Sequence, residues 1–359
     1  MALNFPDPAT QTPVNTWSPT STPSASTNGL TYLWDGTKWG TTGGPDVHVL
    51  KAGDTMTGNL TVPSLNDGPL AGFRNQIING CLRNWQRGLA GNGTDYGADR
   101  MFFANPGTGG NNERDTNAPP ESGLQYSYAI NENAILVNSV EILGNGSPFI
   151  NGSEWTFSFY ARLDIRESSD NEIQFATGNA AASNPVSLAS GFTWSKETLA
   201  SGWRRYSYTF TVGSNPAAGN NCLRLWFRNV ATRNTVTGFQ LEPGPVATPF
   251  EHRPISAEKA LCQRYYQKFE VASVLFGGSV ADGTAVGGSQ SYMPFNTAMR
   301  AIPTVLGNVT YTKEKGPGTI TGVAFWQADP HGCRFNIGAN AAGIYVVRVT
   351  EQPWFDAEL

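Results

Sequence analysis

Apolar and polar residues alternate with a period of two in several separate segments of this chain, which is the pattern of half-buried β-strands. In the segment 155–162, Trp155, Phe157 and Phe159 fall on one face, and mainly polar residues fall on the other. The same alternation recurs in three further segments: 172–175, 206–212 and 223–228. Clusters of Gly, Asn and Pro separate these segments, so we predict that residues 71–253 fold as one β-sandwich.

A helical period follows the predicted sandwich. Ser256 is a suitable N-cap residue, and Leu261, Tyr265 and Tyr266 recur at helical spacing. We therefore predict one connecting helix within residues 254–269. The two tyrosines are expected to pack against the sandwich or against the helix of another copy of the chain, and ligand contact is the alternative.

Residues 270–359 return to the period of two and predict a small C-terminal β-sandwich domain. Four runs are typical of strands: 311–312, 319–325, 332–337 and 343–349. Val346, Val347 and Val349 in the last run are β-branched, and we expect them to be buried.

Residues 1–47 carry too little apolar surface to form a core of their own, and five prolines occur before residue 24. We predict an extended N-terminal arm. One hairpin is expected within it, because Asp35-Gly36 supplies a turn between Trp34 and Trp39, whose rings can face each other across the strands.

Residues 48–70 carry an apolar stripe that one chain cannot bury. Gly53 and Gly58 precede an alternating run in which Leu60 and Val62 share a face. Two apolar residues are too few to stabilise an isolated ribbon. We predict that identical copies intertwine here as a short β shaft and cover one another's stripe, with a loop and an edge strand as the alternative.

Composition favours a loop-rich structural protein. Charged residues make up 14% of the 359, against about 25% in average globular proteins, and the chain has 40 Gly and 23 Pro. The net charge is −4 and the basic residues are scattered, which argues against a nucleic-acid partner. Runs of about 18 apolar residues do not occur, which argues against membrane insertion.

Two sets of motifs resemble those of bacteriophage tail fibres. The run from Gly53 to Leu60, Gly-Asp-Thr-Met-Thr-Gly-Asn-Leu, resembles their shaft repeat, in which three chains intertwine. The ends of the 71–253 segment resemble their carbohydrate-binding-module-like jelly roll. These end motifs are Asn79-Gly80 with Gln86-Arg87-Gly88, Tyr96 with Asp99-Arg100, Gln240-Leu241-Glu242 with Gly244, and Thr248-Pro249-Phe250-Glu251 with Arg253-Pro254.

Further matches lie at both ends of the chain. Asn4-Phe5-Pro6 together with Trp34-Asp-Gly-Thr-Lys-Trp39 resembles the N-terminal arms of marine, cyanophage-like virion proteins of podoviruses or myoviruses. This resemblance implies that the arm docks on another virion protein through Phe5, Trp34 and Trp39. The segments 261–268, 293–305 and 356–359 resemble the C-terminal parts of tail fibres.

Together these resemblances imply a non-enzymatic, homotrimeric tail fibre. It would attach to the adaptor or nozzle protein of the phage tail by its arm and bind host-cell polysaccharide or lipopolysaccharide, without a cofactor. The alternatives are a glycan depolymerase of the tailspike type and a purely structural head or tail component. The first residues lack the features of a secretion signal, so we expect assembly in the host cytoplasm and a place in the virion tail.

Candidate chemistry centres on the acidic residues of the jelly-roll motifs. We expect Asp99, Arg100, Glu242 and Arg253 to form a buried ionic lock that closes the sandwich, with Ca²⁺ binding or catalysis as alternatives. His48, His252 and His331 lie in separate segments, so no metal site is predicted. The four cysteines are far apart, and we expect free thiols, buried at Cys81, Cys222 and Cys333.

Strand alternation also predicts a polar face opposite the apolar stripes. If the apolar residues face the core, the outward residues include six that suit a sugar or an acidic glycan. These are Tyr160, Arg162, Gln174, Arg224, Trp226 and Arg228. Aromatic rings can stack on the C–H face of a sugar, and the polar groups can bond its hydroxyls. Packing against another protomer is the alternative use of this face.

Overall fold

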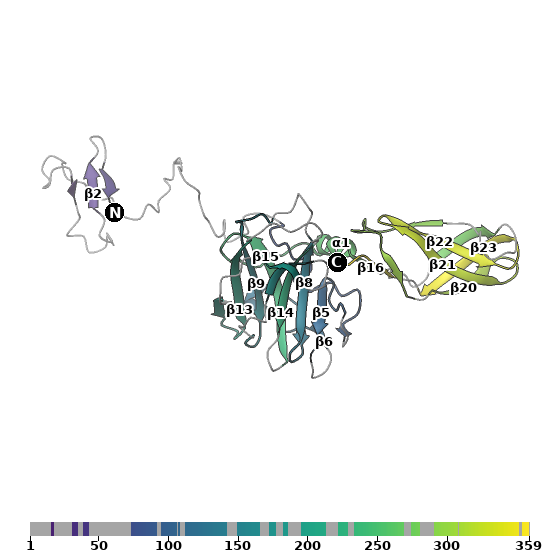
Figure 1. Cartoon of the computed structure of the whole chain (residues 1–359), viewed down its shortest axis with the longest axis horizontal. Helices are drawn as coiled ribbons and strands as arrows, with labels where there is room; N and C mark the ends of the chain where they lie inside the picture. The colour runs from purple at the N-terminus through teal and green to yellow at the C-terminus, as the bar shows by residue number, and fades with distance from the viewer. Residues whose placement is uncertain are drawn as a thin grey trace, which may run out of the picture. The chain divides into compact units, whose positions relative to one another are not determined.

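A computed structural model of the chain (Figure 1) divides into two compact units, Met1–Val62 and Pro63–Leu359, and each is described by itself. The structure describes these residues, some of them by their backbone alone: 16–17, 31–34, 39–42, 73–91, 95–105, 107, 112–141, 149–165, 172–176, 182–185, 195–212, 222–228, 233–268, 274–280, 291–307, 309–351 and 354–358. The predicted shaft at 48–70 and the docking residue Phe5 lie outside them.

The first unit contains a three-stranded antiparallel sheet in the order β1-β2-β3. Its strands are β1 (Thr16–Trp17), β2 (Thr31–Trp34) and β3 (Trp39–Thr42). Trp34 is directly opposite Trp39 in the register of β2 and β3. The predicted pairing of these two segments is therefore confirmed.

The second unit begins with a sandwich of two antiparallel sheets. The five-stranded sheet contains, in spatial order, β11 (Ala182–Pro185), β10 (Glu172–Ala176), β14 (Cys222–Arg228), β8 (Ile135–Glu141) and β5 (Met101–Asn105). The seven-stranded sheet contains β12 (Ser195–Thr198), β13 (Arg204–Thr211), β9 (Glu154–Ala161), β15 (Asn234–Pro243), β7 (Ser127–Ile130), β6 (Asn112–Asp115) and β4 (Ala90–Gly91). A 3-10 turn occupies Pro120–Ser122.

The chain passes back and forth between the two sheets, from β7 to β8, β9 and β10, and later from β13 to β14 and β15. This alternation places consecutive strands in opposite sheets, as in a jelly roll. The predicted mostly-β fold with one helix is confirmed.

One apolar core fills the space between the sheets. Phe157 and Phe159 of β9 contribute to it from one sheet, and Leu223 and Leu225 of β14 contribute from the other. The ring of Phe159 stacks on that of Phe239, with centroids 5.7 Å apart. The strand faces predicted from the alternation at 155–161 and 206–212 are confirmed, because their apolar residues are buried in this core.

The connecting helix α1 spans Ile255–Gln263 and is shorter than predicted. Arg264 is its C-cap, and the N–H of Tyr265 bonds the carbonyl oxygen of Cys262 in a tighter turn. Tyr266 already belongs to β16. The two tyrosines therefore lie beyond the helix. Their spacing matched a helical stripe, but strand pairing and burial decide their conformation.

The C-terminal part contains three antiparallel three-stranded sheets around a second core. The first sheet contains β16 (Tyr266–Lys268), β24 (Trp354–Asp356) and β19 (Thr304–Leu306). The second contains β17 (Val274–Val280), β23 (Gly343–Glu351) and β20 (Thr310–Lys315). The third contains β18 (Ser291–Pro294), β22 (Gly332–Ala339) and β21 (Ile320–Asp329).

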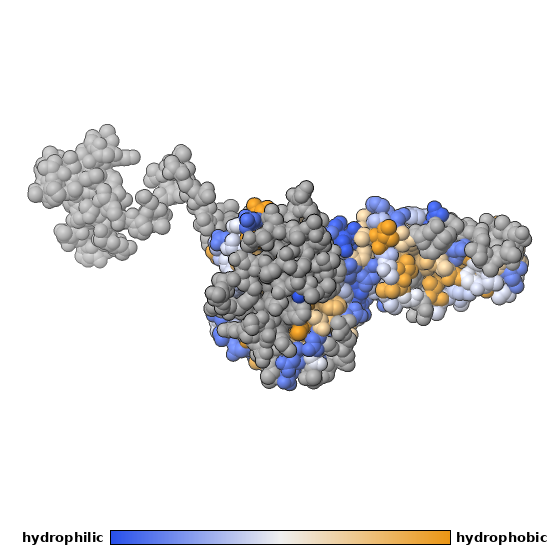
Figure 2. All heavy atoms as spheres, in the orientation of Figure 1, coloured by the Kyte–Doolittle hydropathy of each residue, from blue (hydrophilic) through white to orange (hydrophobic). Residues whose placement is uncertain are grey.

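The strands expected in this part are present, and Val347 and Val349 are buried as predicted, whereas Val346 is half-buried. Alternation along β23 explains the difference, because Tyr345, Val347 and Val349 face the core. Apolar residues also reach the surface of this part, as Figure 2 shows. All four cysteines are free; Cys81 lies in a turn and is half-buried, and the other three are buried.

Candidate functional site

The six residues predicted to form one glycan-facing surface do not lie together. Tyr160 belongs to β9 of the seven-stranded sheet, and Arg162 follows that strand. The other four lie in the five-stranded sheet: Gln174 in β10, and Arg224, Trp226 and Arg228 in β14. Two sheets that pack face to face direct their outer residues to opposite sides. The prediction of one shared surface is therefore wrong.

Two of these six side chains are also buried. Tyr160 is 7% exposed and packs with Leu124, Trp203 and Phe250 on the outer side of its sheet. Burial raises the pKa of its hydroxyl. Arg224 is 3% exposed. The side chains of Gln174, Trp226 and Arg228 lie outside the described part, and Arg162 is exposed and donates to the carbonyl oxygen of Gly202 over 3.3 Å.

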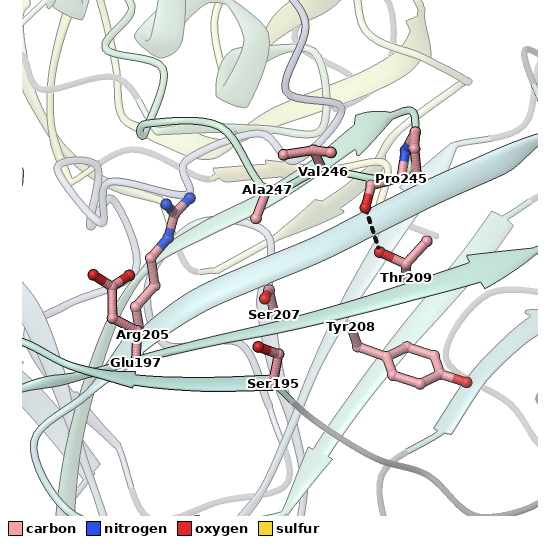
Figure 3. Close-up of a pocket in the computed structure, with 9 residues that line it drawn as sticks. All are labelled: Ser195, Glu197, Arg205, Ser207, Tyr208, Thr209, Pro245, Val246 and Ala247. Atoms are coloured by element: carbon pink, nitrogen blue, oxygen red, sulfur yellow. Dashed lines mark hydrogen bonds between the residues drawn. The ribbon is translucent and has the colours of Figure 1, made fainter. Parts of the chain in front are cut away.

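A polar groove of about 530 Å³ lies instead on the outer side of the seven-stranded sheet (Figure 3). Its floor is the hairpin of β12 and β13, whose register places Ser195 opposite Ser207 and Glu197 opposite Arg205. Alternation explains this placement. Tyr206, Tyr208 and Phe210 of β13 face the core, so the residues between them face outward.

The rim of the groove is the segment Pro245–Ala247, which follows β15. Gly244 directly precedes this segment and has a φ of 100°, a conformation that favours glycine. The Thr209 hydroxyl donates to the carbonyl oxygen of Pro245 over 3.0 Å, as the dashed line in Figure 3 shows. Val246 is 50% exposed and adds an apolar surface to the rim. The rim is therefore tied to the strands beneath it.

Arg205 is anchored by the protein itself. Its guanidinium donates to the carbonyl oxygen of Thr248 and to the Ser158 hydroxyl, and it lies 5.6 Å from the centre of the Tyr160 ring. In Figure 3 it reaches toward the rim. The Nε–H of this guanidinium is buried and has no hydrogen-bond partner among the described residues.

The other polar side chains of the floor have unused hydrogen-bond donors and acceptors. Within the described residues, the side chains of Ser195, Glu197 and Ser207 form no hydrogen bond and no ion pair. A carboxylate accepts hydrogen bonds, and a hydroxyl both donates and accepts. Such a row beside an aliphatic rim suits a ligand that carries several hydroxyl groups. Sequence analysis missed these residues, although the outward positions 205, 207 and 209 alternate with the apolar stripe that it identified.

The predicted ionic lock is also wrong in its pairing, although the side chains of all four residues are buried. Asp99 accepts hydrogen bonds from the backbone N–H of Gln86 over 3.1 Å and from its side-chain Nε2 over 2.8 Å. Burial raises the pKa of Asp99 to about 6. Arg100 pairs with Glu358 and donates to the carbonyl oxygen of Ser139.

Glu242 and Arg253 belong to two other networks. Glu242 pairs with Arg74 over 2.7 Å and accepts a 2.9 Å bond from the backbone N–H of Thr248. Arg253 pairs with Glu258 over 3.2 Å. The partners Arg74, Glu258 and Glu358 lie outside the motifs that suggested the lock, which is why the motifs alone indicated burial but paired the charges incorrectly.

The network of Arg100 and Glu358 also includes Arg87 and joins the end of the chain to the sandwich. Arg87 pairs with Asp356 over 2.8 Å and with Glu358 over 3.3 Å. The guanidinium of Arg87 lies 3.8 Å from the centre of the Tyr266 ring, and that of Arg100 lies 3.6 Å from the centre of the Tyr265 ring. The tyrosines at the end of α1 are thus packed between charged groups of the same chain.

No cluster of three or more His, Cys, Asp or Glu side chains that could hold a metal occurs among the described residues. In the same residues, every helix is too short or too polar to cross a membrane. Comparison with protein-family models gives no match to this chain, and a comparison with curated proteins finds no significant relative.

Proposed function

We propose that this chain is a non-enzymatic, homotrimeric receptor-binding fibre of a bacteriophage tail, and that the groove over β12 and β13 binds a glycan of the host surface. The observation that carries the proposal is the row of unpaired polar side chains, Ser195, Glu197 and Ser207, along the floor of the groove. The likeness of the arm, the shaft and the jelly-roll ends to tail-fibre motifs supports the same proposal.

The groove has the properties that sugar recognition needs. Its volume of about 530 Å³ lies within the range of small-ligand sites. Sugar hydroxyls can donate to Glu197 and exchange hydrogen bonds with the two serines, while the C–H face of the ring contacts Val246. Because the groove is open and polar, one site binds weakly. Three linked copies would raise the overall affinity through effective concentration.

The groove has too few carboxylates for hydrolysis, which favours binding as its function. A glycosidase usually needs two, with one on each side of the scissile bond. Glu197 is the one acidic residue among the described residues that line the groove. A depolymerase would therefore lack its second catalytic group here.

A printed array of purified bacterial lipopolysaccharides and capsular polysaccharides tests the proposal. The full chain should bind a subset of these glycans. Glu197→Gln should weaken that binding about tenfold per site, which corresponds to the loss of one charged hydrogen bond. Glu113→Gln is the matched control, because Glu113 is an exposed carboxylate of β6 in the same sheet but outside the groove.

Two results would contradict the proposal. Equal binding by Glu197→Gln and the unchanged chain would exclude the groove, and an absence of binding across the array would exclude glycan recognition. A rise in reducing ends during incubation with a bound polysaccharide would identify an enzyme instead.

A further inference from the structure

Tyr292 of β18 is an aromatic side chain that the fold holds rigidly at the surface. It is 51% exposed, yet its hydroxyl lies 3.2 Å from Oδ1 of Asp329. The ring also lies directly against Gly332 of the neighbouring strand β22. A Cβ atom at that glycine would be 2.5 Å from Cζ of Tyr292 and 2.5 Å from the carbonyl oxygen of Met293, so glycine lets both the ring and the backbone of β18 approach closely. The ring is thus fixed at its hydroxyl and on the side toward Gly332.

The carboxylate beside this ring is fixed too. Asp329 accepts hydrogen bonds from the backbone N–H groups of His331 over 2.7 Å and of Gly332 over 3.0 Å. The bond from His331, with the tyrosine hydroxyl and the bond from Gly332, lowers the pKa of Asp329, and the carboxylate therefore stays charged at neutral pH. These bonds use Oδ1, whereas Oδ2 has only a 3.5 Å contact with Tyr292 and keeps its capacity to accept.

We infer that Tyr292 and Asp329 form a second carbohydrate contact on the C-terminal part of the chain, with a pyranose as its ligand. The C–H face of the sugar ring stacks on the exposed surface of Tyr292, and a neighbouring sugar hydroxyl donates to Oδ2 of Asp329. A tyrosine whose hydroxyl is already bonded to the protein loses less conformational entropy on binding than an unbonded one. This inference shares its ligand class with the groove but rests on separate residues.

Saturation-transfer NMR on the full chain tests it with three probes: methyl β-D-galactopyranoside, methyl α-D-glucopyranoside and methyl α-D-mannopyranoside. All samples carry Glu197→Gln, which weakens binding in the groove, and the Tyr292 and Asp329 variants are compared within this background so that a change between them reports on this site. We expect transfer to the C–H protons of at least one probe. Tyr292→Phe keeps the ring but loses the hydroxyl bond to Asp329, and it should retain most of the transfer. Tyr292→Leu covers Gly332 without an aromatic face and should lower the transfer about fivefold.

Asp329→Asn provides a second readout. Asn can still accept the two backbone hydrogen bonds but cannot present a charged acceptor, so transfer should also fall, even if Tyr292→Leu proves unstable. Absence of transfer from all three probes would overturn the inference. Equal transfer in the Leu and Phe variants would do so too, and would mean that Tyr292 serves only to cover Gly332. Unchanged transfer in Asp329→Asn would remove the carboxylate from the site and overturn the inference as stated.

Discussion

Most buried charged side chains of the sandwich have an ionic partner, whereas Asp99 has only hydrogen-bond partners among the described residues. Arg74 pairs with Glu242, Arg253 with Glu258 and Arg100 with Glu358. Asp99 receives two hydrogen bonds from Gln86 but forms no ion pair with a described residue. Because burial disfavours its charged form, its pKa rises from 3.8 to about 6. This raised pKa makes Asp99 a contributor to the pH dependence of stability.

Asp99→Asn should remove the contribution of Asp99 to that dependence. The unfolded chain releases this proton near pH 3.8 and the folded chain near pH 6, so in this interval the folded state binds more protons and a rise in pH favours unfolding. Asp99 alone should lower the free energy of unfolding by roughly 2.5 kcal/mol between pH 4 and pH 7. Urea titrations at several pH values would measure the free energy of unfolding of the original chain and of Asp99→Asn. The difference between these two free energies should change with pH.

Asp95→Asn is the control, because Asp95 is an exposed carboxylate close by in the sequence. A difference between the original chain and Asp99→Asn that stays constant from pH 4 to pH 7 would contradict the assignment of a raised pKa to Asp99.

At the scale of elements, β24 attaches the end of the chain to the sandwich. It is the central strand of its sheet, between β16 and β19. Just beyond it, Glu358 pairs with Arg87 and Arg100. The backbone N–H of Ala357 bonds the carbonyl oxygen of Tyr265 over 2.8 Å. The last residues therefore stabilise the turn that follows α1.

Glu358→Gln should destabilise the protein strongly. Arg100 is 2% exposed, and loss of its partner would leave a buried charge without compensation, which costs roughly 3–5 kcal/mol. Glu314→Gln makes the same change in an exposed pair with Arg348 and should cost less than about 1 kcal/mol. Thermal unfolding of both variants would compare them. Similar melting temperatures would show that the Glu358 contacts contribute little.

At the scale of the whole molecule, the second unit leaves large apolar side chains exposed at two places. Phe73 is 61% exposed at the start of the sandwich, and Ile255 is 49% exposed at the start of α1. Leu60 and Val62, which the sequence predicts to share one face of a strand, lie outside the described residues. Association of several copies would cover such groups.

We predict a trimer in solution. Light scattering of the purified chain should give a mass three times the 38.6 kDa of one copy. Leu60→Asp with Val62→Asp should dissociate it by placing charges in the apolar contact. Asn59→Asp with Thr61→Asp places the same charges on the opposite face and should leave the trimer intact. A monomer at micromolar concentration of the unchanged chain would disprove the prediction.

The sequence by itself determined the mostly-β class, the single helix and which side of several strands is apolar. It could do so because these properties follow from local periodicity. The alternation at 206–212 indicates that Tyr206, Tyr208 and Phe210 share a buried face in any sheet that contains them, and they do. The pairing of Trp34 with Trp39 was predictable because the two residues are close in the sequence.

Only the tertiary structure decided which strands share a sheet and which charges meet. Tyr160 and Trp226 both alternate with core residues, but β9 and β14 lie in opposite sheets, a matter of long-range pairing that alternation does not encode. Likewise, Glu242 pairs with Arg74, which lies 168 residues earlier in the chain. The two residues come together because β15 lies beside the first residues of the sandwich. The groove likewise depends on contacts between segments that are far apart in the sequence. Its floor is local to one hairpin, whereas its rim arrives from the segment after β15.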